Sequence, residues 1–118
     1  MLAGKRKVTI IARDAAVRRS LAFALDAEGY QVSAYPDIVA SFADKRQLTA
    51  SCTIVDDDTL NDSLSDAELI GALLPPVVLL LDPHRRFSKV STAGVVLKPY
   101  LGQAVIELVS EVCGDSAL

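Results

Sequence analysis

The sequence predicts an α/β fold built on a doubly wound parallel sheet, in a single domain that spans residues 1–118. Short β-branched or apolar runs alternate along the chain with segments of helical or loop character, as the crossovers of a parallel sheet require. The run 77–81 (VVLLL) is apolar at every position, which is typical of a central strand that helices cover on both faces. Residues of the helix-capping type stand at the borders of the helical segments.

The first half of the chain begins with a predicted strand at residues 8–12 (VTIIA). Asp14 follows it as the expected N-cap of a helix. Apolar residues recur at helical spacing from Val17 to Leu25, and Gly29 is expected to follow the end of this helix.

Two further strands follow in the middle of the chain. Residues 31–35 (QVSAY) form the second strand, which stops at Pro36, and Asp37 is expected to cap a short helix. Residues 51–55 (SCTIV) form the third strand, which leads into three consecutive aspartates, of which Asp56 is the first.

The second half of the chain continues the alternation around the apolar fourth strand. Ser65 and Glu68 form a capping-box pattern ahead of a helix, and residues 94–97 form a fifth strand that ends before Lys98. A last helix is expected to end at Gly114. Its inner apolar stripe consists of Ala104, Val105, Leu108, Val109 and Val112.

The composition narrows the classes of function. With a net charge of −3 the chain offers no basic stripe that could neutralise nucleic-acid phosphates, so nucleic acid is not an expected partner. No apolar run is long enough to cross a bilayer and no targeting segment is visible, so we expect a cytoplasmic protein without a membrane partner. Cys52 and Cys113 are interpreted as structural thiols.

The candidate functional residues lie where the predicted strands end, because parallel α/β sheets bind ligands beyond the carboxyl ends of their strands. These residues are Ala12, Arg13, Asp14, Asp56, Leu80 and Lys98. The aspartates 56–58 have a second interpretation, as a solvated turn, and Arg13 has a second interpretation as an ordinary surface residue. Arg18 and Arg19 are assigned to a solvated helix face.

The stretches AVRRSLAFALDAEGYQVSAYPD (16–37), TIVD (53–56) and LKPY (97–100) resemble the receiver domain of two-component response regulators, in particular the branch of nitrogen-fixation-type regulators. The resemblance covers nearly the whole chain. It implies a flavodoxin-like three-layer sandwich of five strands in the order 2-1-3-4-5. The short region around Pro83, Arg85 and Arg86 implies a shortened or remodelled fourth helix.

The resemblance also implies roles for particular residues. Asp56 matches the carboxylate that accepts a phosphoryl group, and Lys98 matches the lysine that pairs with the acceptor and its phosphate. The family holds Mg²⁺ with an acidic pair after the first strand, and a Ser or Thr at the end of the fourth strand binds the new phosphate. Charge neutralisation by such groups is what phosphoryl transfer to a carboxylate requires.

The chain departs from this pattern at several of these positions. The acidic pair is replaced by Ala12 and Arg13, and the Ser or Thr is replaced by Leu80. Asp14 and Asp57 are the residual acidic groups that could serve as ligands, although Asp14 is more readily explained as a helix N-cap. We hypothesise that the Arg13 guanidinium pairs with Asp56 in place of a metal, and that two cations lower the pKa of Asp56.

The function expected from these features is that of a degenerate receiver domain, not an enzyme, acting by protein–protein contact without a metal or other cofactor. A histidine kinase, a phosphotransfer protein, an effector protein or a second copy of the chain is the expected partner. One alternative is an active receiver that is phosphorylated on Asp56 with Mg²⁺, and another is an antikinase. A flavin- or nucleotide-binding module is disfavoured because no glycine-rich loop follows the first strand.

Overall fold

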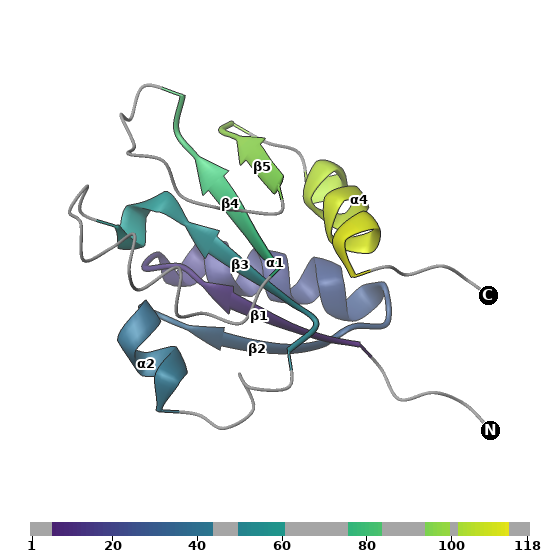
Figure 1. Ribbon diagram of the computed structural model, residues 1–118, viewed down its shortest axis with the longest axis horizontal. Coiled ribbons are helices and arrows are strands. Elements are labelled where there is room, and N and C mark those ends of the chain that lie inside the picture. The colour runs from purple at the N-terminus through teal and green to yellow at the C-terminus, as the bar shows by residue number, and fades with distance from the viewer. Residues whose placement is uncertain (1–5, 44–49, 61–75, 84–93, 100–101, 114–118) are drawn as a thin grey trace.

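A computed structural model describes residues 6–43, 50–60, 76–83, 94–99 and 102–113. They form a five-stranded parallel sheet in the order β2-β1-β3-β4-β5, as the resemblance implied (Figure 1). The strands are β1 (Lys7–Ile11), β2 (Gln31–Tyr35), β3 (Cys52–Asp56), β4 (Val77–Leu81) and β5 (Gly94–Leu97). The helices are α1 (Ala15–Ala27), α2 (Ile38–Phe42), the short 3-10 helix η2 (Asp57–Thr59) and α4 (Gly102–Val112).

The strand register brings the functional positions to one edge of the sheet. Asp56, the last residue of β3, lies opposite Leu80, and Leu81, the last residue of β4, lies opposite Leu97. Lys98 follows β5 and donates its backbone N–H to the Leu81 carbonyl at 2.9 Å. The predicted bounds of β2, β4 and β5 are confirmed, whereas β1 begins and ends one residue earlier and β3 one residue later than predicted.

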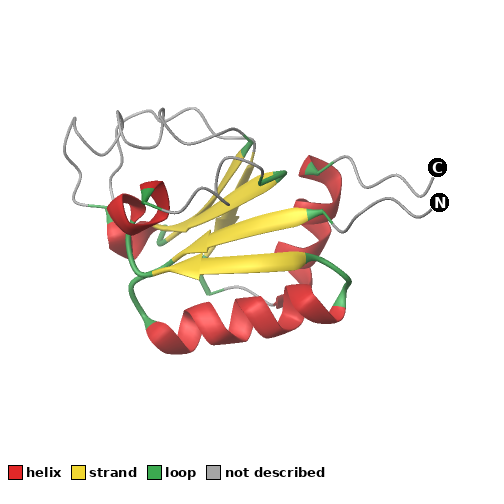
Figure 2. Ribbon diagram, turned by 90° about the horizontal axis from the view of Figure 1, so that it is seen from below, coloured by secondary structure: helices red, strands yellow, loops and turns green. Residues whose placement is uncertain are grey.

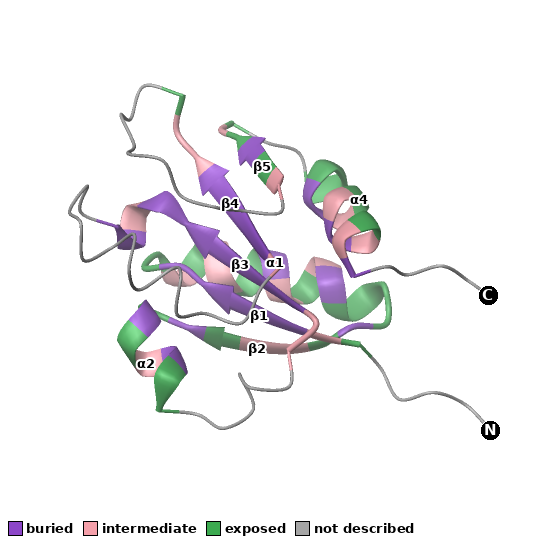
Figure 3. Ribbon diagram, viewed as in Figure 1, coloured by how far each residue is buried: buried purple, intermediate pink, exposed green. Residues whose placement is uncertain are grey.

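Two apolar cores fill the two faces of the sheet. Figure 2 shows α1 below the sheet and α2 above it, and α4 packs beside α1. The larger core joins one face to α1 and α4 through residues such as Leu21, Leu25 and Val109. The smaller core joins the other face to Ile38 of α2 and to Leu60. The central strands are therefore buried almost throughout, as Figure 3 shows.

The caps predicted for α1 are both present. Asp14 Oδ1 accepts hydrogen bonds from the backbone N–H groups of Ala16 (2.7 Å) and Val17 (3.4 Å), so Asp14 is the N-cap. Gly29 follows the C-cap with a φ of 96°, a left-handed conformation that glycine adopts without steric cost. Asp37 caps α2 by accepting a hydrogen bond from the N–H of Ala40 at 2.7 Å.

The apolar stripe of α4 differs from its prediction at one residue. Val105 and Val109 are buried, but Ala104 is exposed, and Ile106 packs against the core instead. Ala104 was wrongly assigned because a small apolar residue carries little periodicity signal of its own. The capping box of Ser65 and Glu68, the remodelled fourth helix and the helix end at Gly114 lie outside the described residues.

Among the described residues, none of the helices has both the length and the apolar character that crossing a bilayer requires.

Candidate functional site

Two adjacent aspartates and one lysine meet at the carboxyl edge of the sheet. Lys98 Nζ donates a hydrogen bond to Asp56 Oδ1 and another to Asp57 Oδ1, each at 2.5 Å. The aspartates lie at the end of β3, and the lysine lies after β5, on the far side of β4. We refer to Asp56, Asp57 and Lys98 as the charged triad. The structure thus confirms that Asp56 and Lys98 are brought together.

Asp57 is a buried member of the triad and not part of a solvated turn. Its side chain is 1% exposed, and its Oδ2 accepts a hydrogen bond from the backbone N–H of Asp82 at 2.7 Å. The chain turns into η2 at this point, with the Asp58 N–H donating to Asp56 Oδ1 at 3.0 Å. The tight turn therefore directs two consecutive carboxylates toward the same ammonium group, and the second interpretation of this segment, as a solvated turn, does not hold for Asp56 and Asp57.

The two carboxylates differ in how their oxygens are used. Both oxygens of Asp57 accept hydrogen bonds, from Lys98 and from the Asp82 backbone. In Asp56 only Oδ1 accepts hydrogen bonds from the described residues. The Asp56 side chain keeps a small exposure of 3%, and its Oδ2 takes no part in the bonds to Lys98 and Asp58. Asp56 is therefore the carboxylate with an oxygen left for chemistry.

The pKa values of the triad are shifted in different directions. Burial raises the pKa of Asp56 above its ordinary value, and the hydrogen bond from Lys98 only partly offsets this effect. Burial also acts to raise the pKa of Asp57, but the hydrogen bonds from Asp82 and Lys98 outweigh it and hold that pKa low. Burial acts to lower the pKa of Lys98, but its bonds to Asp56 and Asp57 raise it overall. The expectation of a lowered pKa at Asp56 was therefore wrong.

Arg13 does not pair with Asp56, in contrast to our hypothesis. Its side chain is exposed, and its one contact with the aspartates is a backbone one: the Arg13 N–H donates to Asp58 Oδ1 at 3.3 Å. Asp56 and Asp57 each form an ion pair with Lys98. The hypothesis failed because Asp57, and not Arg13, takes the place beside Asp56 and Lys98.

Arg18 holds the end of β1 in a way that the sequence did not predict. Its Nη1 donates to the carbonyl oxygens of Ala12 at 2.7 Å and Arg13 at 2.8 Å. A guanidinium therefore binds the two carbonyls that follow β1, so the assignment of Arg18 to a solvated helix face was wrong. Its position one helical turn after the N-cap Asp14 is a weak sequence signal for this contact, because many solvated arginines share it.

At the end of the fourth strand, where the resemblance to receiver domains implies a Ser or Thr, this chain has leucine. Leu80 is fully buried in the larger core, and β4 continues to Leu81, so Leu81 and not Leu80 ends the strand. Both positions lack a hydroxyl. The Lys98–Pro99 peptide bond is cis.

The residues around the triad do not fit a magnesium ion. Ala12 has no ligand atom, Asp14 caps α1 from an exposed position, and both oxygens of Asp57 already accept hydrogen bonds. Mg²⁺ prefers several oxygen ligands in octahedral geometry, but the described residues contain no group of three or more acidic, His or Cys side chains that could hold a metal. The lysine ammonium stands between the two carboxylates instead.

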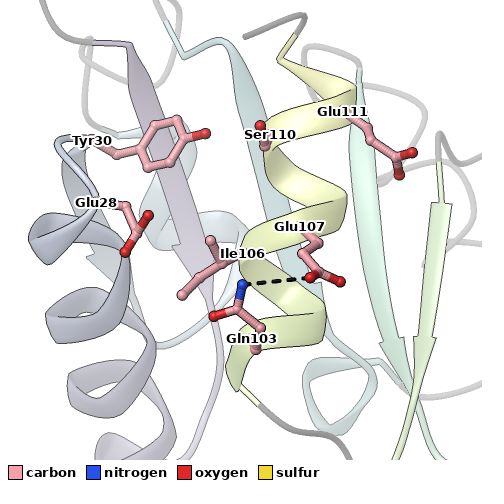
Figure 4. Close-up of a pocket in the computed structure, with 7 residues that line it drawn as sticks. All are labelled: Glu28, Tyr30, Gln103, Ile106, Glu107, Ser110 and Glu111. Atoms are coloured by element: carbon pink, nitrogen blue, oxygen red, sulfur yellow. Dashed lines mark hydrogen bonds between the residues drawn. The ribbon is translucent and has the colours of Figure 1, made fainter.

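Two hollows border the described elements. One of about 320 Å³ lies beside the triad and is lined by Asp82, Pro83, Lys98 and Pro99. The other, of about 530 Å³, lies away from the triad between the end of α1 and α4 (Figure 4). Three glutamates line it, Glu28, Glu107 and Glu111. We place the functional site at the smaller hollow because the charged triad borders it.

Comparisons with solved structures agree with this geometry. The chemotaxis response regulator CheY4 of Vibrio cholerae superposes with a TM-score of 0.76 at 18% identity, over 92% of this chain and 98% of that one. A CheY-like receiver domain from Methanospirillum hungatei JF-1 gives 0.77 at 16% identity, over 92% and 94%. Full-length FixJ from B. japonicum gives 0.75 at 18% identity, over 96% of this chain and 60% of that one.

A search of curated proteins finds a relative at higher identity. The transcriptional regulator protein FixT of Rhizobium meliloti (strain 1021) is 32% identical over 111 residues, which are 93% of this chain and 94% of FixT. The chain belongs to the FixT family. It has the fold of a response regulator receiver domain, so the predicted receiver fold is confirmed. No family model matches the chain.

Proposed function

We propose that this FixT-family protein is a degenerate receiver domain that acts in two-component signalling by contact with another protein, without Mg²⁺-dependent phosphorylation. One observation carries the proposal: Lys98 bridges Asp56 and Asp57 within the protein itself. In this arrangement an internal carboxylate, Asp57, takes up one of the three N–H donors of Lys98 and adds a second negative charge where an incoming phosphate would bind. The protein is accordingly no enzyme and needs no cofactor.

The charge around the triad supports this proposal. Lys98 neutralises only part of the charge of two carboxylates, and a third negative group would have to approach them before the phosphoryl group could transfer. Neither arginine after β1 adds positive charge to the triad, because Arg13 is exposed and Arg18 binds backbone carbonyls. The transition-state charge would therefore be poorly balanced.

One observation favours the active-receiver alternative. Oδ2 of Asp56 is not used in the bonds to Lys98 and Asp58, and the Asp56–Lys98 pair has the arrangement of an acceptor and its lysine. Asp56 could then act as a slow phosphoacceptor if a phosphodonor displaced Asp57 from Lys98.

Intact mass after incubation with acetyl phosphate and Mg²⁺ separates the two functions. For the degenerate receiver we expect no phosphoryl adduct on the wild type, with Asp56→Asn as the baseline. An adduct on the wild type that Asp56→Asn abolishes would overturn the proposal. Asp57→Ala is the informative variant, because it returns a bond of Lys98 to an incoming phosphate while leaving Asp56 in place.

The partner that we propose is a histidine kinase, which the protein would inhibit as an antikinase. The other candidate partners are a phosphotransfer protein, an effector protein and a second copy of the chain. Phe23 of α1 is 80% exposed, which is unusual for a phenylalanine and provides an apolar contact for a partner. Val39 of α2 is 66% exposed on the opposite face of the sheet.

Autophosphorylation of a histidine kinase encoded by the same genome, titrated with this protein, tests the antikinase. We expect inhibition by the wild type and by Asp56→Asn, and loss of at least about tenfold in potency for Phe23→Ser, which corresponds to about 1.4 kcal/mol. Val39→Ser is the matched control and should retain potency. Inhibition that required Asp56 would contradict a mechanism by contact alone.

A further inference from the structure

The hollow between the end of α1 and α4 has the size of a binding pocket and lies apart from the charged triad (Figure 4). Its volume of about 530 Å³ falls within the range of about 300–1,000 Å³ that is usual for ligand pockets. None of the described residues that line it belongs to the triad. Tyr30, which lines it, directly precedes β2, so this part of the hollow lies at the amino edge of the parallel sheet, whereas the triad lies at the carboxyl edge.

Two side chains that pack in the larger core form the floor of this hollow. Tyr30 is only 5% exposed, and its backbone N–H donates to the Leu25 carbonyl at 3.1 Å across the turn that follows α1. Ile106 of α4 is half-buried and packs against the same core. In Figure 4 the Tyr30 hydroxyl is directed toward α4, and the Ile106 side chain is directed toward α1. The floor is therefore mainly apolar, with one hydroxyl group, and the core holds it in place.

Carboxylates surround this floor. Glu28, at the C-cap of α1, and Glu107 and Glu111 of α4 line the hollow from exposed positions. The remaining residues on the rim, Gln103 and Ser110, are neutral, so none of the described lining residues carries a positive charge. Negative charges around one hollow attract a cation and repel an anion. The charge and the floor together favour a ligand with a cationic head and an apolar stem.

We propose that this hollow binds an arginine side chain of a partner protein. A guanidinium group donates from several N–H groups in one plane, so it can bond a carboxylate through two hydrogen bonds or bridge two carboxylates. The methylene stem of an arginine packs on apolar surface while its charged head stays with polar groups. In the hollow the guanidinium meets the glutamates, and the stem lies on Ile106 and Tyr30.

The exposure of the lining residues favours a protein over a free small cation as the occupant. Four of the seven lining residues are exposed, so the hollow is open to solvent. Sites for small molecules usually bury about 70–90% of the ligand surface. An arginine that projects from a protein is also covered by the surface around it, and arginine is enriched among the residues that anchor interfaces. The inference does not rest on the proposed antikinase function, because the hollow is a separate surface that can be tested in the isolated protein.

NMR titration of the isotope-labelled protein with the blocked peptide acetyl-Arg-Leu-Arg-amide tests this site. We expect saturable shifts of the backbone N–H signals of Ile106 and Ser110. The same peptide with citrulline in place of arginine keeps the shape without the charge and should bind at least about tenfold more weakly. Spermidine, a free amine without a guanidinium group, should also bind more weakly than the arginine peptide. Spermidine that bound as tightly would assign the hollow to a free amine and overturn the proposal.

A matched pair of variants separates the hollow from the general charge of the chain. Glu28→Gln removes a carboxylate that lines the hollow, whereas Asp26→Asn removes an exposed carboxylate at the same end of α1 that does not line it. We expect Glu28→Gln to weaken peptide binding about threefold, and Glu28→Gln with Glu107→Gln about tenfold, while Asp26→Asn leaves it nearly unchanged. A wild type without saturable shifts, or equal losses for Glu28→Gln and Asp26→Asn, would overturn the proposal.

Discussion

The end of β1 and the ends of β3 and β5 meet at the same edge of the sheet but hold their charges in different ways. At the end of β1 there is no buried carboxylate: Ala12 is apolar, Arg13 is exposed, and Arg18 binds the backbone carbonyls. At the ends of β3 and β5 two buried carboxylates share Lys98. At the end of β1 an arginine binds two backbone carbonyls, whereas at the ends of β3 and β5 a lysine binds two carboxylates.

This difference teaches how one edge of a receiver fold holds two neighbouring carboxylates together. Without Lys98 the two buried carboxylates would repel each other. Lys98 binds both of them, and the backbone N–H of Asp82 gives Asp57 a further donor.

The largest effect is expected from removing the shared cation. Lys98→Met leaves Asp56 and Asp57 buried without a counter-charge, and we expect a loss of about 3–5 kcal/mol in unfolding free energy at neutral pH. Urea denaturation measures it. The loss should shrink in acid, where protonation removes the repulsion, and a loss that did not change with pH would show that packing of the lysine stem is responsible.

The two carboxylates should differ when each is replaced by its amide. Asp57 accepts one hydrogen bond from the Asp82 backbone and one from Lys98, each on a different oxygen. Asp57→Asn has a single acceptor oxygen, so one of these two donors loses its acceptor, and we expect a loss of about 1–3 kcal/mol in unfolding free energy. Asp56→Asn keeps an oxygen for both donors at Oδ1 and should cost less than about 1 kcal/mol. Equal costs in urea denaturation would show that the two positions are equivalent and would break the comparison.

At the end of β1 the effect should be smaller. Arg18→Met removes the donors to the carbonyls of Ala12 and Arg13, and we expect a loss of about 1–2 kcal/mol in the same measurement. Arg19→Met is the control from the exposed side of α1 and should change stability by less than about 0.5 kcal/mol. A neutral Arg18→Met would mean that water replaces the guanidinium without cost.

The acid titration sharpens the comparison without changing the wild-type chain. Because the pKa of Asp56 is raised and that of Asp57 is lowered, Asp56 should protonate first as the pH falls, as seen by carboxyl-carbon NMR. Asp57 contributes stability above the ordinary carboxyl pKa, and this contribution is lost as the pH falls through its own lower pKa. The stability gap between wild type and Asp57→Asn should therefore close in strong acid; the reverse order of protonation would contradict the assignment.

Much of the fold follows from local signals in the sequence. Strand runs of β-branched residues, the Asp14 cap and the left-handed Gly29 depend on neighbouring residues, so their positions could be predicted to within one residue. The meeting of Asp56 and Lys98 also followed, because the carboxyl ends of parallel strands share one edge of the sheet.

The sequence by itself determined the sheet, the caps and the presence of an aspartate and a lysine at the carboxyl edge of the sheet. Only the tertiary structure decided which charges touch: Asp57 rather than Arg13 beside Asp56, and Arg18 on the carbonyls after β1. The physical reason is that side chains of three consecutive aspartates and of nearby arginines differ in burial through turns and packing, which sequence spacing does not encode. A carboxylate's partner depends on ångström-scale approach across strands, whereas a strand or a cap depends on its neighbours along the chain.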